Sequence, residues 1–264
     1  MNVNALYETI KIEKKGKTAT VTLNRPQSLN SMNTKMMREL LNCLKEIEKD
    51  EEILIVVLKG EGKGFSSGGD IKEMLNLGGE AEFSEIMEVI SDLSMTLYTM
   101  KKLTITGIHG AAAGLGLSLA LATDYIICEE DSKLAMNFIG IGLIPDGGGH
   151  FFLQERLGSG RAKKLMWTGK VIEGQEALMK KLVDEAIPSG KLDRAIEKYI
   201  TECLQKPLMS IVESKSIYAE LNKDRLEKTL QLEKEGQWKM RQTHDHQEGI
   251  RAFVEKRAPQ FKGQ

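Results

Sequence analysis

The stretch ILIVVLKG, residues 53–60, is an apolar run that predicts a strand buried on both faces. Upstream, residues 18–24 (TATVTLN) alternate between apolar residues and threonines, which predicts a half-buried strand. Between the two, an amphipathic helix ending near residue 49 is predicted, with Asn33 or Thr34 as its N-cap. Its apolar residues recur at spacings of three and four: Met37, Leu40, Leu41, Leu44 and Ile47. The chain is therefore expected to open with a strand, a helix and a strand.

The same alternation continues downstream and predicts a layered α/β core. We expect a helix over 82–101, a strand over 104–110, a glycine-interrupted helix over 114–123, and strands over 125–130 and 133–136. From about residue 190 the pattern is helical only, and its last part is very polar. We expect a core over residues 1–200 and a helical region over 201–264 that packs over the core or against a neighbouring subunit.

Composition and charge exclude several classes of protein. Hydrophobic residues make up 41% of the chain, which suits a globular core. The net charge is −1, so nucleic acid is not an expected partner. No apolar run is long enough to span a membrane, and the N-terminal stretch does not resemble a signal peptide. Three scattered cysteines, Cys43, Cys128 and Cys203, suggest buried thiols in a reducing cytoplasm rather than disulfides or a metal site.

Two glycine-rich turns each run from a strand towards a helix. They are FSSGGDIKEM, residues 65–74, and HGAAAGLGLSLALATD, residues 109–124. Small residues let backbone amides approach a ligand, and amides at a helix start favour negative charge. If the turns converge, one amide from each would bind the oxygen of a polarised carbonyl. Ordinary turn geometry and tight helix packing explain the same residues. Neither turn matches the phosphate loop or the dinucleotide fingerprint, so ATP and NAD are not indicated.

A single carboxylate stands in GIGLIPDGGG, residues 140–149, between an apolar run and three glycines. Asp146 suits a general base desolvated by its apolar neighbours Ile141, Leu143 and Ile144, which would favour its neutral form. It equally suits an N-cap for a helix that begins in the following HFFLQERLG. The residues themselves leave both interpretations open.

Together these motifs closely resemble the crotonase (enoyl-CoA hydratase/isomerase) superfamily over nearly the whole chain. The motifs are VTLNRPQSLNSMN, GFSSGGDIKEM, GIHGAAAGLGLSLALATDYIIC, IGLIPDGGG and EGIRAFVEKRAPQF. The resemblance implies a spiral of ββα units followed by a C-terminal α-helical region that forms trimers or dimers of trimers. It also implies an acyl-CoA thioester as substrate, with coenzyme A part of that substrate and no separate cofactor or metal.

The resemblance also places functional residues in this sequence. The amides of Gly69 and Leu115 are implied to bind the thioester oxygen. The second position is usually glycine in relatives, but a donor needs only its N–H. The loop implied to lie along coenzyme A consists of Ser67, Gly68, Asp70, Ile71 and Lys72, with Arg25 near the same region. For Lys72 and Arg25, a solvated surface charge is the alternative.

Two departures from the hydratase pattern favour an isomerase. Where hydratases carry two glutamates this chain has Ser118 and Phe138, which cannot divide the acid and base work of adding water. Some isomerase branches instead carry an acid after the proline of this turn, which is Asp146 here, and the isomerase of phenylacetate catabolism shares the IGLIPD run. The predicted function is therefore an enoyl-CoA isomerase. A hydratase of β-oxidation and a non-catalytic acyl-CoA-binding paralogue are the alternatives.

The remaining candidates have simpler explanations. Ser118 is expected to bond back to its own helix, and Phe138 to fill an acyl pocket or the core. His244 and His246 stand two apart on a predicted helix and so point in different directions, which disfavours a metal site. His150 is expected in the core or at the surface, although it follows Asp146 by one helical turn. His109 replaces an asparagine that is common in relatives.

Overall fold

The computed structural model describes residues 7–76 and 78–264, and its centre is a six-stranded sheet. The strand order is β1-β2-β3-β4-β6-β9; β1 and β2 pair antiparallel, and each later pair is parallel. These strands are β1 Ile10–Lys15, β2 Thr18–Leu23, β3 Ile55–Gly60, β4 Leu103–Ile108, β6 Tyr125–Glu129 and β9 Glu185–Ile187. The predicted α/β class is confirmed.

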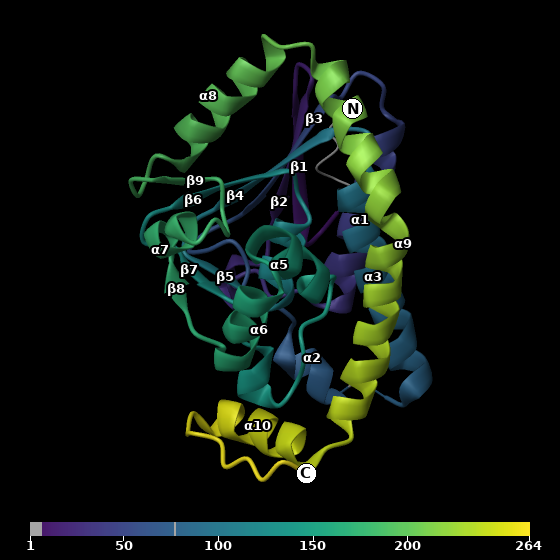
Figure 1. Cartoon of the computed structure of the whole chain (residues 1–264), viewed down its shortest axis with the longest axis vertical. Helices are drawn as coiled ribbons and strands as arrows, with labels where there is room; N and C mark the ends of the chain where they lie inside the picture. Colours follow the sequence, from purple (N-terminus) through teal and green to yellow (C-terminus); the bar gives the residue numbers. More distant parts are fainter. Residues whose placement is uncertain (1–6, 77) are drawn as a thin grey trace.

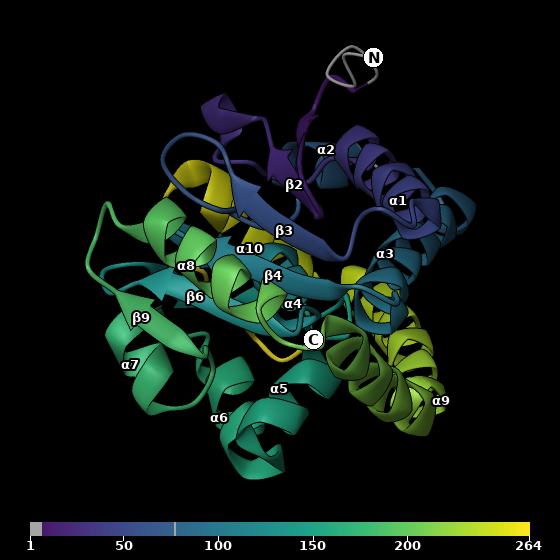
Figure 2. The same ribbon diagram turned by 90° about the horizontal axis from the view of Figure 1, so that it is seen from above.

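A second, three-stranded sheet lies beside the first and joins β5 Ala111–Ala113, β7 Lys133–Ala135 and β8 Ile172–Glu173 in the order β5-β7-β8. Helices surround the two sheets (Figures 1 and 2). The α-helices are α1 Thr34–Lys49, α2 Ile71–Asn76, α3 Glu80–Thr99, α4 Leu115–Leu121, α5 Gly149–Leu157, α6 Ser159–Thr168, α7 Gly174–Met179, α8 Leu192–Leu204, α9 Leu208–Arg241 and α10 His244–Glu255. The described residues also form the short 3₁₀ helices η2 Pro26–Ser28 and η3 Phe138–Ile141.

The opening of the chain differs from the prediction by one strand. The structure begins with the hairpin β1–β2, in which Ile10 and Ile12 are buried while the residues between and after them are exposed. β2 lies between β1 and β3, so Thr18 and Thr22 are buried as well, and the prediction of a half-buried strand is wrong. β3 is buried as predicted.

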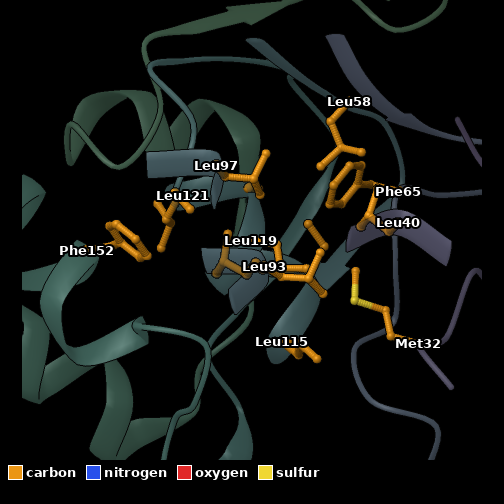
Figure 3. Packing of buried hydrophobic residues seen from close by; sticks show 14 of the residues in the cluster. Met32, Leu40, Leu58, Phe65, Leu93, Leu97, Leu115, Leu119, Leu121 and Phe152 are labelled. Carbon is orange, nitrogen blue, oxygen red and sulfur yellow. The ribbon is translucent and has the colours of Figure 1, made fainter. Parts of the chain in front are cut away.

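The helices that follow agree with the sequence pattern. α1 begins after Asn33, whose side-chain oxygen accepts a hydrogen bond from the Met36 amide at 3.0 Å, so Asn33 is the N-cap. α3 packs against α1 on one side and α9 on the other (Figure 1). The core between these helices and the main sheet is continuous, and Figure 3 shows Leu93 beside Leu119, with Phe65 beside Leu40 and Leu58 in the same cluster.

The chain after residue 190 is helical, as predicted, and α9 is its longest element. α9 runs along α3 and touches α5, so the polar segment does pack over the core. α10 packs against η3 and closes one end of the molecule (Figure 1). The role of residues 201–264 in assembly remains a prediction. Within the described ranges, no helix combines the length and the apolar character needed to cross a membrane.

Candidate active site

A cavity of about 220 Å³ lies where the two glycine-rich turns, η3 and the ends of α3 and α9 meet. Its wall is mostly apolar and holds several thioethers and aromatic rings: Met32, Met37, Met74, Phe83, Ile86, Met87, Ile90, Leu115, Phe138, Ile141, Leu143 and Phe253. Polar residues enter from the loop at 67–70 and from Glu73, Asn137, Asp146, Gln237 and Arg241. A mostly apolar cavity with a few convergent polar groups is typical of a small-molecule site.

The two glycine-rich turns lie side by side at this cavity. The Ser66 amide donates to the Ala111 carbonyl, and the Ala113 amide donates to the Ser66 carbonyl, both at 2.9 Å. A Cβ on Gly68 would lie 2.8 Å from the Ala113 carbonyl oxygen, and the residue has a φ of +97°. Glycine at position 68 is therefore required for the close approach, as well as for the turn itself.

The amides of Gly69 and Leu115 are free for a ligand within the described part of the chain. Met32 pairs with the neighbours of Gly69, accepting from the Asp70 amide and donating to the Gly68 carbonyl, so the Gly69 amide lies on the other side of the segment. Leu115 is the first residue of α4, where an amide lacks an intrahelical partner. Among residues 7–76 and 78–264 neither amide donates to protein, and both residues line the cavity.

Asp146 lines the same cavity and is 9% exposed. Its Oδ2 accepts a hydrogen bond from Gln237 Nε2 at 3.0 Å, whereas Oδ1 is buried and has no hydrogen-bond partner among the described residues. Burial, followed by the negative charge of Glu233, raises the pKa of Asp146 well above its ordinary value, against a smaller lowering by Gln237. Leaving a buried hydrogen-bond acceptor without a partner costs about 1–3 kcal/mol of folding stability. Such an unpaired oxygen is typical of a carboxyl with a functional role rather than of one that only supports the fold.

The N-cap interpretation of Asp146 is wrong, because Glu233 of α9 occupies that role. Glu233 Oε2 accepts from the Gly148 amide at 2.8 Å, and Oε1 accepts from the His150 amide at 3.0 Å. α5 starts after Gly148, whose φ of +79° favours glycine. Glu233 therefore satisfies the free amides of α5, and Asp146 is left facing the cavity.

Gln237, one turn further along α9, holds Asp146 in place. Its Nε2 donates to the Ile144 carbonyl at 2.6 Å as well as to Asp146. Glu233 and Gln237 were not predicted from the sequence. The available signal was the buried stripe of α9, which runs through Leu226 and Leu230 and then continues into this acid and this amide at the same helical spacing.

The predicted coenzyme A loop is only partly at the cavity. Ser67, Gly68, Asp70 and Ile71 line it, whereas Lys72 is exposed and lies outside the lining. Arg25 forms an ion pair with Asp70 at 2.9 Å and donates to the Ser31 carbonyl at 2.5 Å, so it is not a solvated surface charge. Although burial alone would raise the pKa of Asp70, hydrogen bonds from Arg25 and Ser31 bring it below its ordinary value. Arg25 therefore holds the side chain of Asp70 in this loop in place.

Ser118 and Phe138, which stand where hydratases carry glutamates, have the surroundings expected for them. Ser118 is fully buried, and its hydroxyl donates back to the Gly114 carbonyl at 3.4 Å. Phe138 is buried and forms part of the cavity wall. Neither position brings a carboxylate to the cavity.

Three of the histidines bind neighbouring groups. His109 Nε2 lies 2.9 Å from the Gly62 carbonyl, and His246 Nδ1 lies 2.8 Å from the Ile141 carbonyl. His150 Nδ1 lies 2.8 Å from Glu233 Oε1 and so belongs to the surroundings of Asp146. His244 is exposed. The described residues contain no group of three or more His, Cys, Asp or Glu side chains that could hold a metal ion. All three cysteines are buried and free.

The raised pKa of Asp146 predicts a pH-dependent stability. The folded chain binds this proton more tightly than the unfolded chain, so the free energy of unfolding falls as pH rises from the ordinary pKa through the raised one. The slope for one proton is at most about 1.4 kcal/mol per pH unit. Asp146→Asn removes the buried charge, and we expect its urea midpoint to exceed that of the wild type at neutral pH.

Urea titrations across pH provide the check. The advantage of Asp146→Asn should shrink as pH is lowered towards the ordinary range of an aspartate, where the wild-type carboxyl is protonated in both states. A variant that is equally destabilised at every pH would contradict the raised pKa.

Known proteins resemble this chain in sequence and in fold. The family model described as enoyl-CoA hydratase/isomerase matches residues 13–264. YhaR of Bacillus subtilis (strain 168), whose name refers to the same two activities, is 47% identical over 94% of this chain and 96% of its own. A trans-2-decenoyl-[acyl-carrier-protein] isomerase of Streptococcus mutans is 31% identical over 93% of this chain and 94% of its own. The crystal structure of an enoyl-CoA hydratase from Mycobacterium avium subsp. paratuberculosis has a TM-score of 0.89 and 28% identity, covering 97% of this chain and 99% of that one.

Proposed function

The chain belongs to the enoyl-CoA hydratase/isomerase family, and on that premise we propose that it is an acyl-CoA isomerase in which Asp146 moves a double bond by a proton shift. The family acts on acyl-CoA thioesters. In the proposed reaction, ionised Asp146 removes a proton from the carbon between the thioester and the double bond of a 3-enoyl-CoA. The electrons move into a dienolate, and the protonated carboxyl then returns the proton to the far end of the former double bond. No water is added, and the carboxylate of Asp146 is regenerated.

The amides of Gly69 and Leu115 are proposed to hold the thioester oxygen as it gains negative charge. Two unpaired donors already fixed by the turns need no reorganisation when the charge develops. They line one cavity with Asp146, which supports this division of work. Burial in the apolar wall raises the pKa of Asp146, which makes its carboxylate a stronger base than that of an ordinary aspartate.

The proposal rests on which carboxylates around the cavity already have hydrogen-bond or ion-pair partners. Asp70 is engaged by Arg25, and Glu73 accepts a hydrogen bond from the Thr34 amide at 2.7 Å. Among the described acids that line the cavity, Asp146 is the one with a buried oxygen that has no hydrogen-bond partner. One available carboxyl suffices for a proton shift between two carbons of one substrate.

A hydratase is the second candidate because relatives carry both names. Hydration needs one group to activate water and another to deliver a proton. Ser118 is engaged with its own helix, and Phe138 has no ionisable group, so these positions supply neither. A hydratase would therefore have to use Asp146 in both roles.

Product analysis with two substrates tests the proposal. We expect a 3-enoyl-CoA to be converted to the 2-enoyl isomer, and a trans-2-enoyl-CoA to give little or no 3-hydroxyacyl product. Fast hydration of the second substrate would overturn the isomerase assignment. Binding of thioesters without turnover, and without deuterium uptake from D₂O into any of them, would identify a non-catalytic paralogue instead.

Other parts of the proposal rest mainly on the resemblance to the family. We propose that coenzyme A lies along residues 67–72, that no separate cofactor is used, and that residues 201–264 support a trimer or a dimer of trimers in the cytoplasm. Ser67, Gly68 and Ile71 line the cavity, which supports this placement of coenzyme A.

A further inference from the structure

Arg241 brings a positive charge into the wall of a mostly apolar cavity. It is the last residue of α9, and it continues the stripe of Glu233 and Gln237 by one further turn. Four residues of α-helix span about 6 Å. Arg241 therefore lies about 6 Å further along α9 than Gln237, the residue that holds Asp146. The cation therefore lies beyond the base along the same wall.

Protein groups within the described chain leave this cation without a counter-ion. The guanidinium of Arg241 donates to the Met74 carbonyl at 3.3 Å and lies over the Phe83 ring, 5.3 Å from its centroid. Among residues 7–76 and 78–264, no carboxylate lies within ion-pair distance of it, and positions 1–6 and 77 contain no Asp or Glu. Burial lowers the pKa of Arg241, with no nearby carboxylate acting against it. Arginine nevertheless stays charged in proteins, so the charge itself persists.

The acids of the cavity wall cannot serve as that counter-ion. Asp70 is paired with Arg25, and Glu73 accepts from the Thr34 amide. Asp146 is held by Gln237, and its burial favours the neutral form. Placing a guanidinium in apolar surroundings without an anion is unfavourable. The planar guanidinium can donate two parallel hydrogen bonds to one carboxylate. The missing partner is therefore expected on the ligand.

We propose that Arg241 selects acyl-CoA thioesters whose acyl chain ends in a carboxylate. This inference rests on the proposed function, because it takes the cavity as the acyl site. The acyl chain of the substrate would pass Asp146 and present its terminal carboxylate to Arg241. This carboxylate would replace the water that otherwise solvates the guanidinium. A plain fatty chain would instead desolvate the cation and offer it no partner.

Binding of saturated thioesters tests this selection without relying on catalysis. Calorimetric titration would compare a ladder of acyl-CoA chain lengths, each ending either in a methyl group or in a carboxylate. Saturated chains cannot be isomerised, so the result stands whether or not the protein turns over a 3-enoyl-CoA. At the best length we expect the carboxylate-ended thioester to bind roughly 10- to 100-fold more tightly, the range for hydrogen bonds to a charged group.

Arg241→Met, which keeps the apolar stem and removes the charge, should abolish this preference and strengthen binding of the methyl-ended chain. Arg241→Lys should retain part of the preference. Lys239→Met is the matched control, because Lys239 is an exposed basic residue in the same last turn of α9 and its loss changes the helix-end charge equally. The preference should survive in Lys239→Met. Thermal unfolding of each variant would confirm that it is folded.

Two results would overturn the proposal. An equal loss of affinity for both kinds of thioester in Arg241→Met would mean that Arg241 contacts coenzyme A rather than the end of the acyl chain. No preference in the wild type at any chain length would mean that the guanidinium only supports the Met74 carbonyl at the end of α2.

Discussion

Replacing Asp146 by Asn is expected to lower the turnover of a 3-enoyl-CoA by a factor of about 10²–10⁴. The amide keeps the shape of the side chain and an oxygen that can accept from Gln237, so the cavity should remain intact. What disappears is the group that takes the proton and returns it. Because substrate contacts with the turns are untouched, affinity for a saturated acyl-CoA should be close to that of the wild type.

Steady-state rates together with calorimetric binding separate these two effects. Asp193→Asn is a suitable control, because that carboxylate is exposed and, among the described residues, forms its ion pair with Lys59 at the surface. It should retain wild-type rates. A variant Asp146→Asn that turns over substrate at the wild-type rate would show that another group moves the proton.

Leu115→Pro is expected to lower turnover by a further route, the loss of one donor to the thioester oxygen. Leu115 is the first residue of α4, a position where proline is well tolerated because the amide has no helical partner. The substitution therefore deletes the N–H with little disturbance of the helix. Losing one such donor typically costs about 2.7–4 kcal/mol of barrier, or roughly 10²–10³ in turnover.

The control for this variant is Leu115→Ala. Both changes remove a leucine side chain that is only 3% exposed, and both should destabilise the core, but the alanine variant keeps the amide. The ratio of the two turnover numbers therefore isolates the donor. Equal rates in the two variants would remove the Leu115 amide from the mechanism.

Much of the fold could be predicted because its signals are local. The apolar run of β3 and the helical spacing of α1 predict their elements correctly, and Asn33 caps α1 as one of two candidates. β1 was missed because its two buried isoleucines stand among charged residues and end in a lysine pair, which is a pattern typical of an edge strand. The burial of the threonines of β2 follows from that missing neighbour.

The candidate site also contains residues that the sequence predicts and residues that it does not. Glycine turns and Asp146 carry their signal in consecutive residues, so they were found. Gln237 and Arg241 reach the cavity, and Glu233 reaches the first amides of α5, only because α9 packs along α3, a contact between distant parts of the sequence. In the sequence they are three polar residues of a very polar helix. Their helical spacing in line with Leu226 and Leu230 becomes informative once it is known which face of α9 is buried.

The most direct test of the proposed chemistry follows the proton itself. A 3-enoyl-CoA carrying deuterium on the carbon beside the thioester would be converted in ordinary water under single-turnover conditions. If one buried carboxyl both removes and returns the proton, part of the label should reappear at the far carbon of the former double bond. A product with no deuterium at that carbon would contradict the claim that Asp146 alone carries the proton from one position to the other.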